Sequence, residues 1–253
     1  MAGIANATLT TIGTATYQGE DYNLIWDDDN NGNSLIWLDY TNATPRSEAE
    51  LANRFLQNWA TNLDYDLTYN INASYNVIWK DIAWRLGRTV DGKSIKGFEG
   101  DPDSDGHYNY THGYNLANSE MGHLFYTELG NKGYQNTDGT WNTDTIEFIA
   151  SPDIIPQGPN FLQNTGDFDN LKASWYWSDT KYSESTGRHR AWYFNMFNGQ
   201  QGWDGNFGGY GMAVRAGQVS ATNPVPEPST LLLMGVGLLG LAGYSRKRFS
   251  KKS

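Results

Sequence analysis

The chain has 253 residues with 28 acidic and 18 basic side chains, and it contains no cysteine. The lack of cysteine excludes disulfide bonds and thiolate chemistry. Five of the basic residues and one acidic residue lie in residues 224–253, so the rest of the chain carries a net charge of −14. Such a body repels nucleic acid and anionic membranes, and it also repels acidic polysaccharides unless cations bridge the two.

The N-terminal residues 1–7 read MAGIANA and end in an Ala-Asn-Ala triplet of the kind that signal peptidase cleaves. Neither a basic segment nor a complete apolar segment precedes this triplet. We interpret residues 1–7 as the remnant of a longer signal peptide, which makes Thr8 the expected first residue of the mature chain. The alternative is a chance triplet in a terminus of small residues.

Residues 8–219 are expected to form one domain, because no internal repeat and no linker divides them and their length suffices for a sizeable core. The linker-like segment SATNPVP begins only at Ser220. Ten tryptophans and sixteen tyrosines indicate a core built from aromatic side chains, with polar ring atoms near the surface.

The first elements in chain order are a hairpin and a helix. Apolar residues at 23–26 and 34–38 flank a turn of Asp, Asn and Gly, which predicts the hairpin. The segment Ser47-Glu48-Ala49-Glu50 fits a capping box at the start of the helix. The apolar residues expected on one face of that helix are Leu51, Ala52, Phe55, Leu56, Trp59 and Leu63.

A second helix is expected over residues 119–129, with Gly130 as its stop. Its apolar face comprises Met121, Leu124, Phe125 and Leu129. Three further strands are expected at 174–179, 190–197 and 210–215, each bounded by Gly, Asn or Asp. Since no βαβ rhythm is present, the sequence predicts an α+β domain with an antiparallel sheet and two main helices.

Two acidic segments resemble calcium loops. The first segment follows a D-x-D-x-D-G pattern with Asp101, Asp103, Asp105 and Gly106. In such loops alternate carboxylates converge on a hard cation. Position twelve of this loop is His112, a poor calcium ligand, so a closing carboxylate would come from elsewhere. A solvated acidic turn is the alternative.

The second acidic segment follows the same pattern more weakly, with Asp27, Asp29 and Asn31. For these residues we favour a role in the hairpin turn over calcium binding.

Other chemistry-bearing residues carry weaker signals. His107 and His112 lack a third zinc ligand at a suitable spacing, and His123 is interpreted as structural. Glu120 and Glu128 are eight residues apart, about 12 Å along a helix axis, which exceeds the usual separation of a glycosidase carboxylate pair.

The C-terminal segment has three parts in succession. The first part is a short rigid motif of Val225, Pro226, Glu227, Pro228 and Ser229. An uncharged run over residues 229–245 follows and is expected to form a transmembrane sorting helix, and a basic tail ends the chain at 246–253. The strongly apolar part, 231–244, is shorter than the roughly 20 residues of a comfortable bilayer span. The basic tail favours the cytoplasmic side, which leaves the body of the protein outside the inner membrane.

This arrangement resembles the PEP-CTERM sorting signal of Gram-negative bacteria. The resemblance implies recognition and cleavage by an exosortase, with the tail removed and the body released or attached at the cell surface. An ordinary tail anchor is the alternative.

A second resemblance is to Lcl C-terminal-like domains and covers most of residues 20–217. It rests on five short segments in order: Asn58-Trp59-Ala60-Thr61-Asn62-Leu63, Trp84-Arg85-Leu86, Ser119-Glu120-Met121-Gly122-His123-Leu124-Phe125, Tyr176-Trp177-Ser178 and Ala213-Val214-Arg215. The chain departs from the family pattern at Gly87 and Ala216, where proline is expected, and at Gly211-Met212, where Ala-Trp is commoner. The resemblance implies a C-type-lectin-like fold and glycan binding, and it supplies no catalytic residues.

The favoured function is that of a non-catalytic surface or matrix protein that binds extracellular polysaccharide, with calcium as a possible cofactor. Candidate ligand-facing aromatics are Trp175, Trp177, Trp192 and Trp203, in the Gly- and Asn-rich C-terminal part. A hydrolase that acts on polysaccharide with carboxylates as acid and base is one alternative, and a self-associating structural matrix protein is another.

Overall fold

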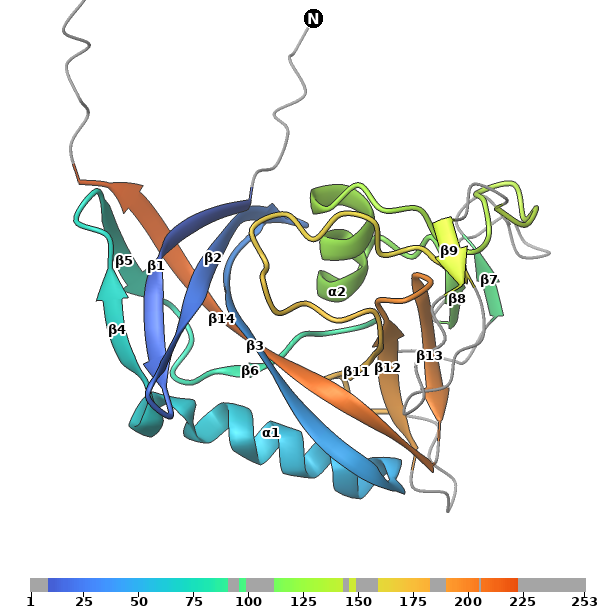
Figure 1. Cartoon of the computed structure of the whole chain (residues 1–253), viewed down its shortest axis with the longest axis horizontal. Coiled ribbons are helices and arrows are strands. Elements are labelled where there is room, and N and C mark those ends of the chain that lie inside the picture. The colour runs from blue at the N-terminus through green and yellow to red at the C-terminus, as the bar shows by residue number, and fades with distance from the viewer. Residues whose placement is uncertain are drawn as a thin grey trace, which may run out of the picture.

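A mixed sheet of 12 strands organises the structure (Figure 1). The computed structural model describes residues 9–90, 96–98, 112–142, 146–148, 159–182, 190–204 and 206–222. Ten strands follow one another across the sheet in the order β4-β1-β2-β3-β14-β11-β12-β13-β8-β7, while β5 and β6 also pair with β14. The strands of this sheet are β1 (Leu9–Tyr17), β2 (Glu20–Asn30), β3 (Asn33–Glu48), β4 (Thr68–Ile71), β5 (Tyr75–Trp79), β6 (Arg85–Leu86), β7 (Lys96–Phe98), β8 (His112–Tyr114), β11 (Trp175–Trp177), β12 (Ala191–Asn195), β13 (Gln200–Asp204) and β14 (Asn206–Ala221). A separate two-stranded sheet joins β9 (Ile146–Phe148) and β10 (Pro159–Asn160).

The expected hairpin is confirmed by β2 and β3, which pair antiparallel up to Asn30 and Asn33. The two residues between them, Asn31 and Gly32, have positive φ angles of 52° and 81°. Positive φ at both central positions is the requirement of a type I′ turn, which Asn-Gly satisfies and which matches the twist of the flanking strands.

The expectation of a purely antiparallel sheet is wrong at two pairs of strands. β11 runs parallel to β14 through the pair Tyr176 and Tyr210, and β7 runs parallel to β8. The residue pattern of a strand shows which face is buried but not the direction of its neighbour. The three strands expected at 174–179, 190–197 and 210–215 are confirmed as β11, β12 and part of β14.

Helix α1 (Ala49–Asp66) confirms the first expected helix, but the predicted capping box does not form. Ser47 and Glu48 remain extended, because they still pair with Phe207 and Asn206 of β14. The helix therefore begins at Ala49, and no side chain makes a capping hydrogen bond.

The apolar face of α1 also differs from the expected one. The buried residues are Ala49, Ala52, Asn53, Leu56, Ala60 and Leu63. Leu51 and Phe55, which were expected on this face, are 48% and 56% exposed. The small side chains of Ala52 and Ala60 let the helix lie close to the sheet, and the buried face is rotated toward Asn53.

The second expected helix is confirmed as α2 (Glu120–His123), which continues directly into a π-helical turn, η1 (Leu124–Glu128). Ser119 caps the start, because its hydroxyl accepts a hydrogen bond of 3.0 Å from the backbone N–H of Gly122. Gly130 follows the end with a φ of +62°, as its stop role requires.

Two apolar cores lie on opposite faces of the sheet. In β2 and β3, Leu24 and Ile36 point into the core that α1 covers, whereas Ile25 and Trp37 point into the core around α2. Alternate side chains of a strand point to opposite faces, so uninterrupted apolar runs are expected where both faces are covered. Figure 1 shows α1 and α2 on the two sides of the long β3–β14 pair.

Strand β14 extends to Ala221, so Ser220 and Ala221, expected at the start of the linker, are paired with β5. Residues 1–8 and 223–253, including the expected signal-peptide remnant and the sorting motif, lie outside the described residues. Within the described part of the chain, no helix is long and apolar enough to cross a membrane.

Candidate functional site

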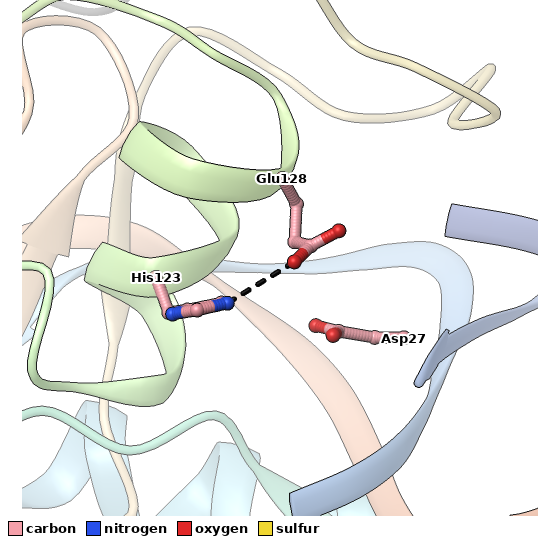
Figure 2. A group of neighbouring side chains, drawn as sticks. All are labelled: Asp27, His123 and Glu128. Atoms are coloured by element: carbon pink, nitrogen blue, oxygen red, sulfur yellow. Dashed lines mark hydrogen bonds and ion pairs between the residues drawn. The ribbon is translucent and has the colours of Figure 1, made fainter. Parts of the chain in front are cut away.

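Three titratable side chains meet between the β2–β3 hairpin and the second helix (Figure 2). Asp27 comes from β2, and His123 and Glu128 come from α2 and η1. One potential ligand atom from each residue lies within 4.8 Å of the other two. Asp27 follows Ile25 by two residues, so the strand directs both side chains toward the face that the second helix covers.

The π-helical turn brings His123 and Glu128 together. In a regular α-helix, residues five apart point about 140° away from each other around the axis. Here the backbone N–H of Leu129 bonds to the carbonyl of Leu124 at 2.9 Å, which is the i→i+5 hydrogen bond of a π turn. His123 Nε2 and Glu128 Oε1 lie 3.1 Å apart as a result.

The cluster is shielded from solvent and partly held by neighbouring donors. Asp27 is 0% exposed. Its Oδ2 accepts hydrogen bonds from Asn30 Nδ2 at 2.8 Å and Trp37 Nε1 at 3.1 Å. The side chains of His123 and Glu128 are 12% and 0% exposed. The buried atoms Asp27 Oδ1 and Glu128 Oε2 have no hydrogen-bond partner among the described residues.

The environment of the cluster shifts both Asp27 and His123 toward their protonated forms. Burial raises the pKa of Asp27 to about 6, against the opposing hydrogen bonds from Asn30 and Trp37. For His123, burial lowers the pKa, but the hydrogen bond with Glu128 and the nearby acidic charges outweigh burial and raise it overall. Protons therefore bind to these two side chains more readily than to the free side chains.

These shifts predict that the metal-free protein loses stability as pH rises. A carboxyl group whose pKa is raised from 3.8 to about 6 stabilises the folded state below pH 3.8, and that contribution is lost as pH rises through 6. The expected loss from Asp27 is about 3 kcal/mol in the free energy of unfolding. His123 acts in the same direction, because its raised pKa also favours the protonated folded state.

Urea unfolding between pH 4 and pH 8 with a chelator present would measure this effect. Asp27→Asn is the matched variant, since its neutral amide has nearly the same shape and does not titrate. The difference in unfolding free energy between the two proteins should vary with pH by about 3 kcal/mol. Parallel pH profiles would contradict the prediction.

A second site is an open hollow of about 320 Å³ beside α1. Its lining combines amide, cationic and aromatic side chains: Glu50, Asn53, Arg54, Gln57, Thr180, Lys181, Tyr182, Arg190 and Ala191. Asn53 is 6% exposed, and its Nδ2 donates to the carbonyl of Ser178 at 2.9 Å. Its Oδ1 is buried and has no hydrogen-bond partner among the described residues.

The residues predicted to bind metal differ in their positions and contacts. Asp101, Asp103 and Asp105 lie outside the described residues. Of the second acidic segment, Asp27 joins the cluster with His123 and Glu128. Asp29 Oδ1 accepts from the Gly32 N–H at 2.9 Å within the turn, and Asn31 Nδ2 donates to the carbonyls of Ala117 and Ser119. These three side chains thus make separate sets of contacts.

The four candidate tryptophans also differ in position. Trp177 and Trp192 are 0% exposed, so the expected exposure of these two rings is wrong. Both rings lie on strands of the sheet, Trp177 on β11 and Trp192 on β12, and are buried in the interior of the protein. Trp175 and Trp203 are partly buried. Arg190, which lines the hollow, lies 3.8 Å from the centre of the Trp203 ring.

Sequence reasoning missed the cluster because it treated His123 and Glu128 as residues of a regular helix. The signal in the sequence is Asp27, a charged residue that directly follows the apolar residues 24–26 of the expected hairpin. A carboxylate at such a position needs a partner.

Comparisons with known proteins identify the C-terminal segment. Residues 224–248 match the PEP-CTERM protein-sorting motif, which includes Val225 to Ser229 and the first three basic residues after the apolar run. No curated protein and no solved structure matches the chain. Residues 224–248 are therefore a PEP-CTERM sorting motif, the signal of an exported protein that an exosortase processes in Gram-negative bacteria.

Proposed function

We propose that the protein is a non-catalytic component of the cell surface or extracellular matrix that binds extracellular polysaccharide. In this proposal residues 8–219 are an Lcl C-terminal-like domain and the sorting motif delivers it to the outside of the cell. The observation that carries the binding proposal is the polar hollow beside α1. Its volume of about 320 Å³ lies at the lower end of the range typical of ligand sites.

The composition of the hollow favours an anionic sugar. Among the described residues that line the hollow, the cationic Arg54, Lys181 and Arg190 outnumber the one acidic residue, Glu50, whereas the chain as a whole is strongly acidic. Guanidinium groups recognise carboxylates through paired, charge-assisted hydrogen bonds. A uronic acid unit of a polysaccharide offers such a carboxylate together with hydroxyl groups for the neighbouring amides.

Three of the segments that resemble Lcl C-terminal-like domains lie next to one another in the fold. Arg85, in the second segment, binds Glu120 of the third through two hydrogen bonds of 2.7 Å. Val214, in the last segment, pairs with Arg85 in the sheet. Segments far apart in the sequence thus meet around one partly buried ion pair.

Calcium at Asp101, Asp103 and Asp105 remains part of the proposal, as a cation that bridges the acidic body to an acidic polymer. The pair of Glu120 and Glu128 gives the hydrolase alternative no support, because Glu120 is bound to Arg85 and to the backbone N–H of Arg88. Glu128 is bound to His123 instead. The two glutamates therefore have separate partners and do not form an acid and base pair.

Calorimetric titration of the mature protein with polygalacturonate oligosaccharides would test the proposal. Arg54→Gln should weaken binding by roughly 10-fold or more, since it removes one hydrogen bond between charged groups, worth about 1.5–3 kcal/mol. Lys80→Gln is the control, because it removes the same charge from a residue that does not line the hollow. Equal losses in both variants, or equal binding of neutral dextran, would contradict the hollow as the site, and release of shortened sugars would favour the hydrolase.

A further inference from the structure

We propose that Asp27, His123 and Glu128 bind a divalent transition-metal ion, with Zn²⁺ as the representative ion. This inference is independent of the polysaccharide proposal, because the cluster lies in the core around the second helix and shares no residue with the hollow.

The donor set suits such an ion. Imidazole nitrogen and carboxylate oxygen are both zinc ligands, and three protein ligands leave a fourth position for water or another group. Three donors at about 2.0–2.1 Å from a tetrahedral ion lie about 3.3 Å from one another. The three donors here already lie within 4.8 Å of one another, so small side-chain rotations bring them to that spacing.

Unpaired oxygens within the cluster are the second, independent observation. Asp27 Oδ1 and Glu128 Oε2 are buried and have no hydrogen-bond partner among the residues that the structure describes. Each of these oxygens belongs to a side chain that is 0% exposed. Buried carboxylate oxygens without donors are costly, and a metal ion supplies the missing interaction for both.

The surrounding side chains hold the ligands in place. Trp37 and Asn30 fix Asp27 through Oδ2, which leaves Oδ1 for the metal. The Nδ2 of Asn30 also donates to the carbonyl of Glu120 at 3.1 Å. Outer contacts of this kind orient metal ligands and sustain affinity. The π turn sets the distance between the other two ligands, and such turns are frequent at functional sites.

The presence of an imidazole distinguishes this site from a calcium loop. Calcium prefers six to eight oxygen ligands, whereas imidazole favours zinc and its neighbours in the transition series. A proton shared between Asp27 and Glu128 would satisfy the same oxygens, so the experiment must separate a metal from a proton.

The test is calorimetric titration of the chelator-treated mature protein with Zn²⁺, Ca²⁺ and Mg²⁺ at pH 7.5. We expect saturable binding of Zn²⁺ at this cluster. His123→Gln and Glu128→Gln should each weaken this binding by more than the roughly 10–100-fold that outer-shell changes cost. Asp29→Asn is the matched control, since its amide oxygen can still accept the Gly32 N–H; its affinity should stay close to that of the unchanged protein.

Co²⁺ provides a readout that does not depend on folding of the variants. Bound to the unchanged protein, it should give the visible absorption of a four-coordinate ion, and Zn²⁺ should displace it. Affinity should fall as the pH is lowered to 5.5, because protons compete for the same ligands. Absence of saturable Zn²⁺ binding, or equal binding by all variants, would overturn the proposal and leave the shared proton as the explanation.

Discussion

Replacing Glu120 with alanine is expected to lower the free energy of unfolding by about 3–5 kcal/mol. The side chains of Arg85 and Glu120 are each 13% exposed, and two hydrogen bonds of 2.7 Å join them in a bidentate pair. Glu120 also accepts the backbone N–H of Arg88 at 2.9 Å. The substitution leaves the partly buried guanidinium of Arg85 without its main partner and removes the ion pair that links the start of α2 to β6.

A double-mutant cycle in urea separates this ion pair from general packing. The double variant Arg85→Met with Glu120→Leu should cost less than the sum of its two single substitutions, because it leaves neither charge without its partner. Arg88→Ala is the surface control. Arg88 is 53% exposed and pairs with Asp179 at 3.4 Å, so its loss should cost less than about 1 kcal/mol. Additive losses in the cycle would show that the pair is not coupled.

Short sequence patterns correctly predicted the β2–β3 hairpin and the second helix, because both depend on residues that are close together in the sequence. The Asn-Gly turn and the apolar runs on either side determine the β2–β3 hairpin, and its observed pairing agrees. Ser119 and the apolar face that includes Met121 and Phe125 determine the start and orientation of the second helix. Each of these signals acts within a few residues, so it is readable in the sequence.

Features that depend on distant segments could not be predicted in this way. The pairing of β3 with β14 keeps Ser47 extended. The capping box therefore does not form, although its residues are all present in the sequence. The direction of β11 depends on β14, more than thirty residues later in the chain. Trp177 and Trp192 look like exposed loop aromatics in a Gly- and Asn-rich context, but β11 and β12 bury them.

The cluster of Asp27, His123 and Glu128 depends partly on local sequence and partly on contacts between distant segments. Asp27 was recognised as an acidic residue of the hairpin, but its burial follows from the α2 and η1 segment that packs against it. The contact between His123 and Glu128 depends on one π turn, which no periodicity of apolar residues signals. The hollow beside α1 joins helix residues to residues 180–191, and only the folded chain brings these segments together.

Trp37 connects this cluster to the core, and its removal is the second large effect that we expect. Trp37→Ala should lower the free energy of unfolding by about 3–5 kcal/mol, because the ring is 0% exposed and fills the core around α2. The ring packs tightly against Gly87, where a Cβ atom would lie 3.0 Å from Trp37 Cζ3 and 2.9 Å from Met121 Cγ. A side chain at residue 87 would therefore displace the ring of Trp37 or the side chain of Met121.

Trp37→Phe separates the packing of the ring from its hydrogen bond. Phenylalanine keeps most of the apolar contact but cannot donate to Asp27 Oδ2, which then retains only the hydrogen bond from Asn30. The indole hydrogen bond lowers the pKa of Asp27, so its loss should raise that pKa above about 6. The variant should therefore be more destabilised at pH 8, where the carboxylate is charged, than at pH 4, where Asp27 is protonated in the folded state.

Urea unfolding of both variants at pH 4 and pH 8, with a chelator present, would measure the two contributions. The loss in Trp37→Ala should be large at both pH values, because packing does not titrate. The extra loss in Trp37→Phe at pH 8 should approach the 1.5–3 kcal/mol typical of a hydrogen bond to a charged group. An equal loss at both pH values would show that the indole serves packing alone, with the Nδ2 of Asn30 as the donor that stabilises the charge of Asp27.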